Sequence, residues 1–300
     1  MEPGDVARSD AKDRPSDAAV EATKGERKRR RPKDRTDIFP PTNRSDAAEG
    51  LIPPSIFGAY CRSDGALASP PTVVPFRDGR VCVFVKTLGG LEYLVKQEAA
   101  VSFGSAVRDC AAVQGKIYLD LEVSPEEFPE ATRKLLRLRT IESVHLVVLC
   151  ADGIAQDATD AEQQLRQWAA AVDWRKCYAF WASATECGTC FEDVTFRCTG
   201  KRLGDQQWTS HDSQRWFGGA MQNDTHWKAQ MKDFLVEVMP AVEGSRLVVS
   251  MRMSRAEGLG RRDIVHPGKT TLRGCLAHCL LKCAHLDRGD VVIDPMCGSA

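Results

Sequence analysis

The sequence lacks long apolar runs and carries no net charge. None of its apolar stretches approaches the roughly 20 residues of a membrane-spanning helix, and the first five residues lack the apolar core of a secretory signal peptide. The 41 basic and 41 acidic side chains cancel, which excludes a chain that is basic throughout. Affinity for nucleic acid would therefore have to come from local patches. We expect a soluble chain in the cytoplasm, the nucleus or both.

Few residues suggest a disulfide framework or a metal site. The chain has 12 cysteines, and because it has no secretory signal we expect free thiols in a reducing compartment. Cys187 and Cys190 form a Cys-x-x-Cys pair of the kind that binds zinc, with Cys177 and Cys198 at longer spacing. The other interpretation is that these cysteines pack as small apolar side chains. One pair is weak evidence for zinc, so we predict no metal site.

The composition changes near residue 75. Residues 1–75 are rich in Asp, Ala, Arg, Pro and Ser and have few large apolar side chains. Such a composition cannot offset the entropy lost on ordering, so we predict a disordered tail. Within it, residues 27–35 are mostly basic. This run suits a nuclear-localisation or polyanion-binding segment, or it is a solvated charge run with no receptor.

Residues 81–150 alternate between strand and helix patterns. Valines that alternate with other residues predict the first strand, and apolar residues at helical spacing follow a Gly-Gly break. This order of elements predicts a small ferredoxin-like α+β domain. The predicted elements are a strand at 81–85, a helix from about 91, a strand at 117–121, a helix that starts at the capping box of Ser124 and Glu127, and a strand at 143–149.

Residues 160–258 contain a second set of elements, followed by basic residues. A-form RNA is bound mainly through phosphates and 2′-hydroxyls, so arginines fixed at strand ends and in loops suit it. The other interpretation is that these are solubilising surface charges. The predicted elements are a helix at 161–172, a strand at 193–198, a helix that Thr209 or Ser210 caps, and strands at 234–239 and 247–253. The candidate RNA-binding residues are Arg197, Lys201, Arg202, Arg261 and Arg262.

The last residues predict the beginning of a cofactor-binding sheet. Val291-Val292-Ile293 reads as a buried strand that runs into an Asp-Pro-x-x-Gly turn at 294–298, and a helix with an apolar stripe is predicted at 272–283. A strand that ends in an acid and a glycine turn is typical of the first β-to-α connection of a Rossmann-like sheet. The further strands of such a sheet do not follow. We therefore expect the chain to be the front of a longer enzyme.

Six short motifs occur in the same order in a known family, and with them the chain resembles the THUMP-domain RNA methyltransferases. The resemblance implies an α+β chain with a ferredoxin-like domain (81–150), a THUMP domain that grips the tRNA 3′ end (160–258), and the first strand of a Rossmann-like class I methyltransferase domain (263–300). The motifs are Phe196-Arg197-Cys198, Phe217-Gly218-Gly219-Ala220, Trp227-Lys228-Ala229, Arg261-Arg262, Thr270-Thr271-Leu272-Arg273 and Asp294-Pro295-Met296-Cys297-Gly298.

The resemblance also implies an activity, a cofactor and partners. The activity is that of a tRNA guanine-N2 methyltransferase that uses S-adenosylmethionine in the acceptor-stem region. The partners are tRNA and a small zinc-binding activator subunit docked on the methyltransferase sheet. The residues that would line the cofactor pocket are Asp294, Pro295, Met296, Cys297 and Gly298. The other interpretation of Asp294 is a helix-capping residue in a strand-to-loop exit.

Two catalytic features of the family have no counterpart in these 300 residues. No acid follows the glycine turn to hold the ribose hydroxyls, and no Asn/Asp-x-Pro-aromatic loop follows to orient the guanine amine. Ala300 also stands where the family pattern has glycine. We therefore assign no catalytic residue and expect the chain itself to be inactive.

The alternative function is a non-catalytic RNA-binding fragment. An RNA-thiolating enzyme is disfavoured, because that chemistry needs a pyrophosphate loop and a reactive cysteine.

Overall fold

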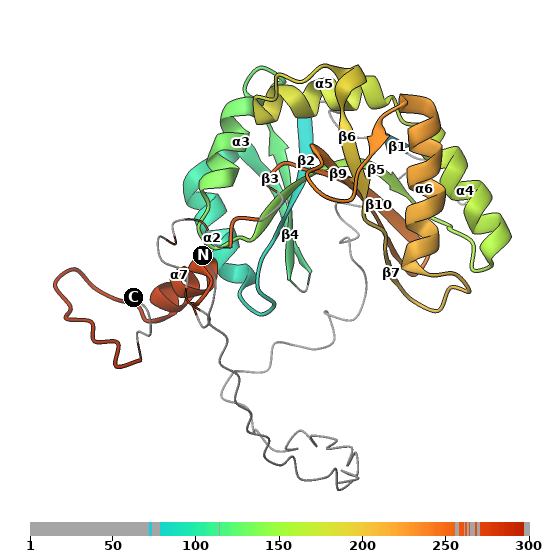
Figure 1. The fold of residues 1–300 in the computed structure, drawn as a ribbon. Coiled ribbons are helices and arrows are strands. Elements are labelled where there is room, and N and C mark those ends of the chain that lie inside the picture. Colours follow the sequence, from blue (N-terminus) through green and yellow to red (C-terminus); the bar gives the residue numbers. More distant parts are fainter. Residues whose placement is uncertain are drawn as a thin grey trace, which may run out of the picture. The chain divides into compact units, whose positions relative to one another are not determined.

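A single mixed β-sheet runs through the computed structural model (Figure 1), which describes residues 72–73, 79–113, 115–255, 258–260, 262, 264, 268 and 271–296. The strand order is β3-β4-β2-β5-β10-β9-β6-β8, with β1 also paired to β5 and β7 also paired to β9. The pairs β6–β8, β6–β9 and β7–β9 are parallel and the others are antiparallel. The strands are β1 (Thr72–Val73), β2 (Arg80–Lys86), β3 (Val107–Val113), β4 (Lys116–Glu122), β5 (Ser143–Ala151), β6 (Thr195–Cys198), β7 (Lys201–Leu203), β8 (Lys228–Ala229), β9 (Val236–Glu243) and β10 (Arg246–Arg252).

Helices α2 to α6 pack on one face of this sheet (Figure 1). Their inward side chains and alternate strand residues form one apolar core, which includes Phe128, Trp168 and Trp174. The other face has a smaller apolar cluster around Phe84 and Tyr118. Among the described residues, no helix has the length and apolar character needed to cross a membrane. The helices are α2 (Glu92–Phe103), α3 (Phe128–Arg137), α4 (Ala158–Ala170), α5 (Trp174–Thr185), α6 (Ser210–Thr225) and α7 (Gly274–Cys283), with 3-10 turns at Gly104–Ala106 and Phe191–Asp193.

The first half of the sheet contains the strands predicted at 81–85, 117–121 and 143–149, as β2, β4 and β5. The capping box before α3 is also present, because Ser124 N donates to the Glu127 carboxylate at 3.0 Å and Glu127 N donates to Ser124 Oγ at 3.2 Å. Strand β3 has no counterpart in the prediction. It is an edge strand that is only half-buried, so its sequence has no clear apolar alternation.

In the second half, the helix predicted at 161–172 is present as α4, and Thr209 caps α6 through a reciprocal bond with Asp212. Helices α4 and α6 lie side by side (Figure 1). Helix α5 was absent from the prediction, although Asp173 caps its first turn and its aromatic side chains bury one face. The described part of the chain is thus a mixed α/β structure built on a mixed sheet.

Strands β6 and β7 both pair with β9, in parallel and in the same register. Residues 199 and 200 separate the two strands. Cys198 pairs with Val238 and Lys201 with Ala241, so Gly200 falls opposite Pro240, which has no backbone N–H to donate. Gly200 also lies against the first turn of α6. A Cβ at this position would overlap the Ser210 carbonyl oxygen and approach Gln214 N to 2.9 Å.

The last described segment differs from the prediction. The helix is present as α7, but its buried residues are Cys275 and Cys279, whereas Leu272 and Leu280 are exposed. The strand predicted at Val291–Ile293 is wrong for the described residues, since these positions are exposed and unpaired. An apolar run becomes a strand only where another strand accepts its backbone hydrogen bonds, and none does so in the described part of the chain.

We predict that Gly200→Ala lowers the free energy of unfolding by about 1–3 kcal/mol, because the backbone of α6 must move to admit the methyl group. Urea denaturation monitored by circular dichroism measures the change. Gly188→Ala is the matched control, since nothing lies within 4 Å of its added Cβ. Equal stability of the two variants would contradict the close packing of Gly200.

Candidate nucleic-acid interface

A carboxylate on β9 holds two arginines from the neighbouring strands β6 and β10. Glu237 accepts hydrogen bonds from Arg197 Nη2 at 2.6 Å and from Arg252 Nη1 at 3.0 Å. Thr199 Oγ1 donates a third bond to it at 2.7 Å. The Glu237 side chain is only 4% exposed, so this ion-pair network is largely shielded from solvent.

The network fixes the charge of Glu237. Burial alone would raise the pKa of this carboxyl group, but the hydrogen bonds from Arg197, Thr199 and Arg252 outweigh burial and hold the pKa below its usual value. Glu237 is therefore ionised at neutral pH. Its negative charge keeps both guanidinium groups in fixed positions.

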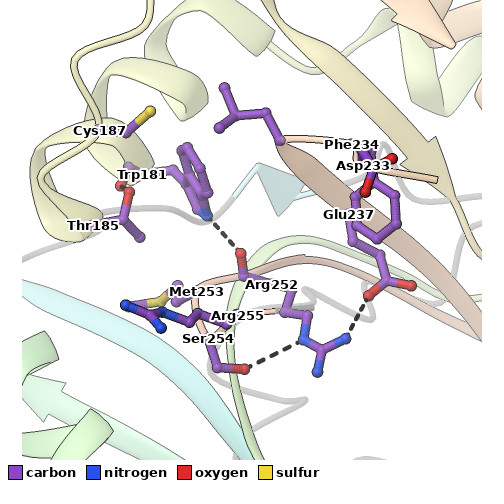
Figure 2. A pocket seen from close by; sticks show the side chains of 11 residues that line it. Trp181, Thr185, Cys187, Asp233, Phe234, Glu237, Arg252, Met253, Ser254 and Arg255 are labelled. Carbon is purple, nitrogen blue, oxygen red and sulfur yellow. Dashed lines mark hydrogen bonds and ion pairs between the residues drawn. The ribbon is translucent and has the colours of Figure 1, made fainter. Parts of the chain in front are cut away.

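An open pocket of about 540 Å³ lies beside this network (Figure 2). Trp181 Nε1 donates to the Arg252 carbonyl oxygen at 2.7 Å, and Arg252 Nε donates to Ser254 Oγ at 3.3 Å. Phe234 lies on the opposite wall, and the Arg197 guanidinium carbon is 4.2 Å from the centre of its ring. The pocket thus combines aromatic surfaces with cations, which are the groups that single-stranded nucleic acid uses for stacking and charge pairing.

Of the five basic residues predicted to bind RNA, the four that the structure describes occupy different environments. Arg197 belongs to the Glu237 network, and Arg202 donates to the carbonyl oxygens of Gly204 and Gln206. Arg262 donates to the carbonyl oxygens of Leu136 and Leu138, so it ties the segment before α7 to the end of α3. Lys201 is exposed and forms no ion pair with any described residue. Arg261 lies outside the described residues.

Several residues of the pocket were missed in the sequence. Phe234, Arg252 and Trp181 come from three separate segments. The pairing of β9 with β10 brings Phe234 near Arg252, and the packing of α5 on the sheet adds Trp181. The signal available was an aromatic residue at the start of one predicted strand and a basic residue near the end of the next. Such pairs are common, so they would not have singled out this site.

The four cysteines around the Cys-x-x-Cys pair lie in different environments. Cys177 and Cys198 are buried, and burial raises the pKa of each thiol to about 12. Cys198 packs against Gly218, where an added Cβ would lie 2.8 Å from Cys198 Cβ, which explains a glycine in the Phe-Gly-Gly-Ala motif. The Cys187 and Cys190 thiols are free. Within the described ranges, no three His, Cys, Asp or Glu side chains group as metal ligands would.

Of the predicted cofactor residues, Asp294, Pro295 and Met296 lie in an exposed segment. Asp294 Oδ1 accepts a hydrogen bond from Met296 N at 2.8 Å, and Met296 is exposed. Cys297 and Gly298 lie outside the described residues. No pocket described here is lined by residues 291–296. The described residues therefore contribute one carboxylate turn and do not by themselves enclose S-adenosylmethionine.

We predict that Glu237→Gln lowers the free energy of unfolding at pH 7 by about 1.5–3 kcal/mol, because two guanidinium groups lose their charged partner. A depressed carboxyl pKa contributes stability above its unfolded value of about 4.3 and loses it as the pH falls further. The difference between the proteins should therefore shrink below about pH 4.

Urea denaturation at pH 7 and pH 3.5 tests this prediction. Glu186→Gln is the control, because it removes an exposed partner of Arg133 and should cost within about 0.5 kcal/mol. Equal losses in the two variants would mean that the Glu237 network adds nothing beyond a surface ion pair.

Sequence comparison relates the chain to tRNA methyltransferases. Residues 260–300 match the family described as "RMKL-like, methyltransferase domain". The mouse protein named tRNA (guanine(6)-N(2))-methyltransferase THUMP3 is 41% identical over 105 residues, which cover 35% of this chain and 21% of the relative. The human protein of that name is 40% identical over 107 residues, with the same coverage. The matched part thus spans about a fifth of the length of these relatives.

Solved structures share the fold at low sequence identity. TrmN from Thermus thermophilus has a TM-score of 0.53 and 20% identity, covering 68% of this chain and 54% of that one. SMU.472, a putative methyltransferase complexed with SAH, has a TM-score of 0.50 and 12% identity, covering 70% and 50%. The comparisons confirm the resemblance to the THUMP-domain RNA methyltransferases that the sequence motifs indicated.

Proposed function

We propose that this chain is the RNA-binding part of a tRNA guanine-N2 methyltransferase that uses S-adenosylmethionine. The observation that carries the proposal is the roughly 40% identity to proteins named tRNA (guanine(6)-N(2))-methyltransferase. The whole protein would then form N2-methylguanosine in the acceptor-stem region of tRNA. Transferase chemistry would require parts of the relatives that the match does not span.

The proposal divides the chain into a ferredoxin-like domain (81–150), an RNA-binding THUMP domain (160–258) and the start of a methyltransferase domain (263–300). The β-α-β-β-α-β element order over 80–151, with strand order β3-β4-β2-β5, supports a ferredoxin-like domain. The THUMP domain would comprise residues 160–258, which hold the Glu237 network and the aromatic pocket. A domain of this kind would bind the tRNA 3′ end by stacking bases on Phe234 or Trp181 and by pairing phosphates with cations at the rim.

S-adenosylmethionine is the cofactor that the comparisons support, through the methyltransferase family match and the neighbour complexed with SAH. In the proposed enzyme it supplies the methyl group. This chain would contribute Asp294, Pro295, Met296, Cys297 and Gly298 to the pocket wall. Its remaining walls would come from outside the described residues.

Three further expectations belong to the proposal. A small zinc-binding activator subunit would dock on the methyltransferase sheet of the whole protein. The basic run at 27–35 would bind a polyanion or a nuclear-import receptor, and the protein would work in the cytoplasm, the nucleus or both. Arg261 and Arg262 would bridge the THUMP and methyltransferase domains or contact RNA.

We predict that Lys201→Ala weakens tRNA binding at low salt and makes the slope of log K against log salt shallower by about 0.7–0.9, the value for one lost phosphate contact. Arg197 and Arg202 are poorer choices, because removing them breaks internal hydrogen bonds. Filter binding across a salt series measures the slope. Lys134→Ala is the control, an exposed lysine on α3 in the helical layer. A slope equal to that of wild type would make Lys201 a plain surface charge.

We also predict that the chain binds tRNA but shows no measurable affinity for S-adenosylmethionine at micromolar cofactor, because one exposed turn cannot offset the entropy of immobilising the ligand. Calorimetry with the cofactor and methyl-transfer assays on tRNA measure both properties. Cofactor binding by this chain would contradict the prediction. If the longest protein encoded around this sequence binds tRNA without methylating it, the non-catalytic RNA-binding function would replace the enzyme.

A further inference from the structure

A second pocket lies at one end of the sheet, where β2 and β10 finish and β5 begins. We call it the sheet-end pocket. It has a volume of about 360 Å³ and is lined by Lys86 at the end of β2, Ser143 at the start of β5, Arg252 at the end of β10, and by Gly258, Gly260 and Arg273 from the segment that follows the sheet. Arg252 also lines the aromatic pocket of Figure 2, so the two pockets are neighbours.

Backbone hydrogen bonds hold the walls of this pocket in place. Glu142 N donates to the Lys86 carbonyl oxygen at 2.7 Å, and Leu259 N donates to the Glu142 carbonyl oxygen at 2.7 Å. Gly274 N then donates to the Gly260 carbonyl oxygen at 2.8 Å. Gly258 has φ +79, and an added Cβ there would lie 3.3 Å from Arg252 Nη2. Glycine at this position therefore keeps the guanidinium edge open.

The charges around the pocket are predominantly positive. The one acid in its wall, Glu142, forms an ion pair with Arg273. Lys86 Nζ donates to Met239 Sδ at 4.0 Å, and it forms no ion pair with a described carboxylate. Burial lowers the pKa of Lys86 to about 8. The positive charges of Lys201, Lys116 and Arg252 act in the same direction, and the Glu237 carboxylate opposes them. An anion bound beside Lys86 would stabilise the charged form of its amino group and raise its pKa again.

A hydroxyl group completes the set of donors. Ser143 Oγ lies 2.9 Å from Nε2 of the buried His145, whose ring stacks on Phe84 at 4.5 Å. Burial lowers the pKa of His145 well below its usual value, so the ring is neutral. His145 Nδ1 has no hydrogen-bond partner among the described residues. If Nε2 carries the proton and donates to Ser143 Oγ, the serine O–H can donate into the pocket, and Nδ1 is left as a bare acceptor.

We propose that the sheet-end pocket binds a phosphate group through Lys86, Arg252 and Ser143. The inference deepens the proposed function, on which its RNA part rests: in the RNA complex the group is one phosphodiester of the backbone. Because Arg252 joins this pocket to the aromatic pocket, a single strand can place a phosphate in one and the neighbouring base against Phe234 or Trp181 in the other.

The first test compares Lys86→Met with Lys116→Met. Both changes remove a lysine charge that burial has perturbed, on the same face of the sheet, but only Lys86 lines the pocket. By calorimetry, Lys86→Met should weaken binding of inorganic phosphate by about tenfold or more, because a charge-assisted hydrogen bond is lost. Lys116→Met should stay within about threefold, because it changes only the surrounding field. Equal losses in both variants would overturn the pocket.

The second test uses the same proteins with tRNA over a salt series. Lys86→Met should make the salt slope shallower by about 0.7–0.9. Suppose that Lys86→Met loses inorganic phosphate binding but keeps the wild-type salt slope with tRNA. The pocket would then bind a free phosphate, and the proposal that it binds an RNA phosphate would be overturned. A third outcome is that wild type binds tRNA but not millimolar inorganic phosphate, and that Lys86→Met binds tRNA as wild type does. Phosphate binding in the sheet-end pocket would then be overturned, and the proposed function would stand. If wild type binds no tRNA, the proposed function fails, and the first test still decides the pocket.

A third measurement needs no variant and so does not depend on the folding of one. Lysine side-chain nitrogen-15 NMR on the wild-type protein follows the titration of each ammonium group. Saturating phosphate should raise the pKa of Lys86 above about 8 and leave that of Lys116 nearly unchanged. An unchanged titration of Lys86 would overturn the proposal.

Discussion

The antiparallel pairing of β5 with β10 is the contact on which the rest of the structure depends. It joins the strands of the first half of the chain to those of the second half in one sheet. Every residue of β5 is buried, so its edge hydrogen bonds cannot be left to solvent. The register sets His145 opposite Arg252, and through β2 it sets Phe84 opposite His145. Both candidate pockets result from this alignment.

The same alignment decides which charges are neutralised. Glu237 pairs with Arg197 and Arg252 from the two adjacent strands, so two guanidinium groups are held rigidly beside the aromatic pocket. Lys86 and Lys116, in contrast, are perturbed by burial and have no described carboxylate at ion-pair distance. Fixed cations on a half-buried face favour an anionic ligand, because solvent screens them less than it screens surface charges. Positive charge on this face therefore supports both proposals made for it.

The segment after the sheet links the RNA-binding candidate to the methyltransferase match. Arg262 donates to the carbonyl oxygens at the end of α3, and Arg273 pairs with Glu142. These contacts bring the start of the region that matches the methyltransferase family against the end of the sheet. The sheet-end pocket therefore borders the first residues of that region.

The sequence by itself determined the elements with strong local signals. The alternating strands β2, β4, β9 and β10 and the capped helices α3 and α6 follow from apolar period and capping residues, which act over a few positions. The order of the motifs, from Phe196-Arg197-Cys198 to the Asp-Pro turn, likewise sufficed for the family resemblance that the comparisons confirm.

Only the tertiary structure decided the edge strand β3, the pairing of β5 with β10, and the surroundings of each cation. Arg197 and Lys201 look alike in the sequence, yet one is held by Glu237 and the other is exposed. The Val291–Ile293 pattern predicts a strand, yet it has no partner among the described residues. In each case the deciding group is far away in the sequence. A local sequence pattern determines whether a segment forms a strand or a helix and which face is apolar. The hydrogen-bond partner of a residue and its electrostatic surroundings depend on which strand lies beside it.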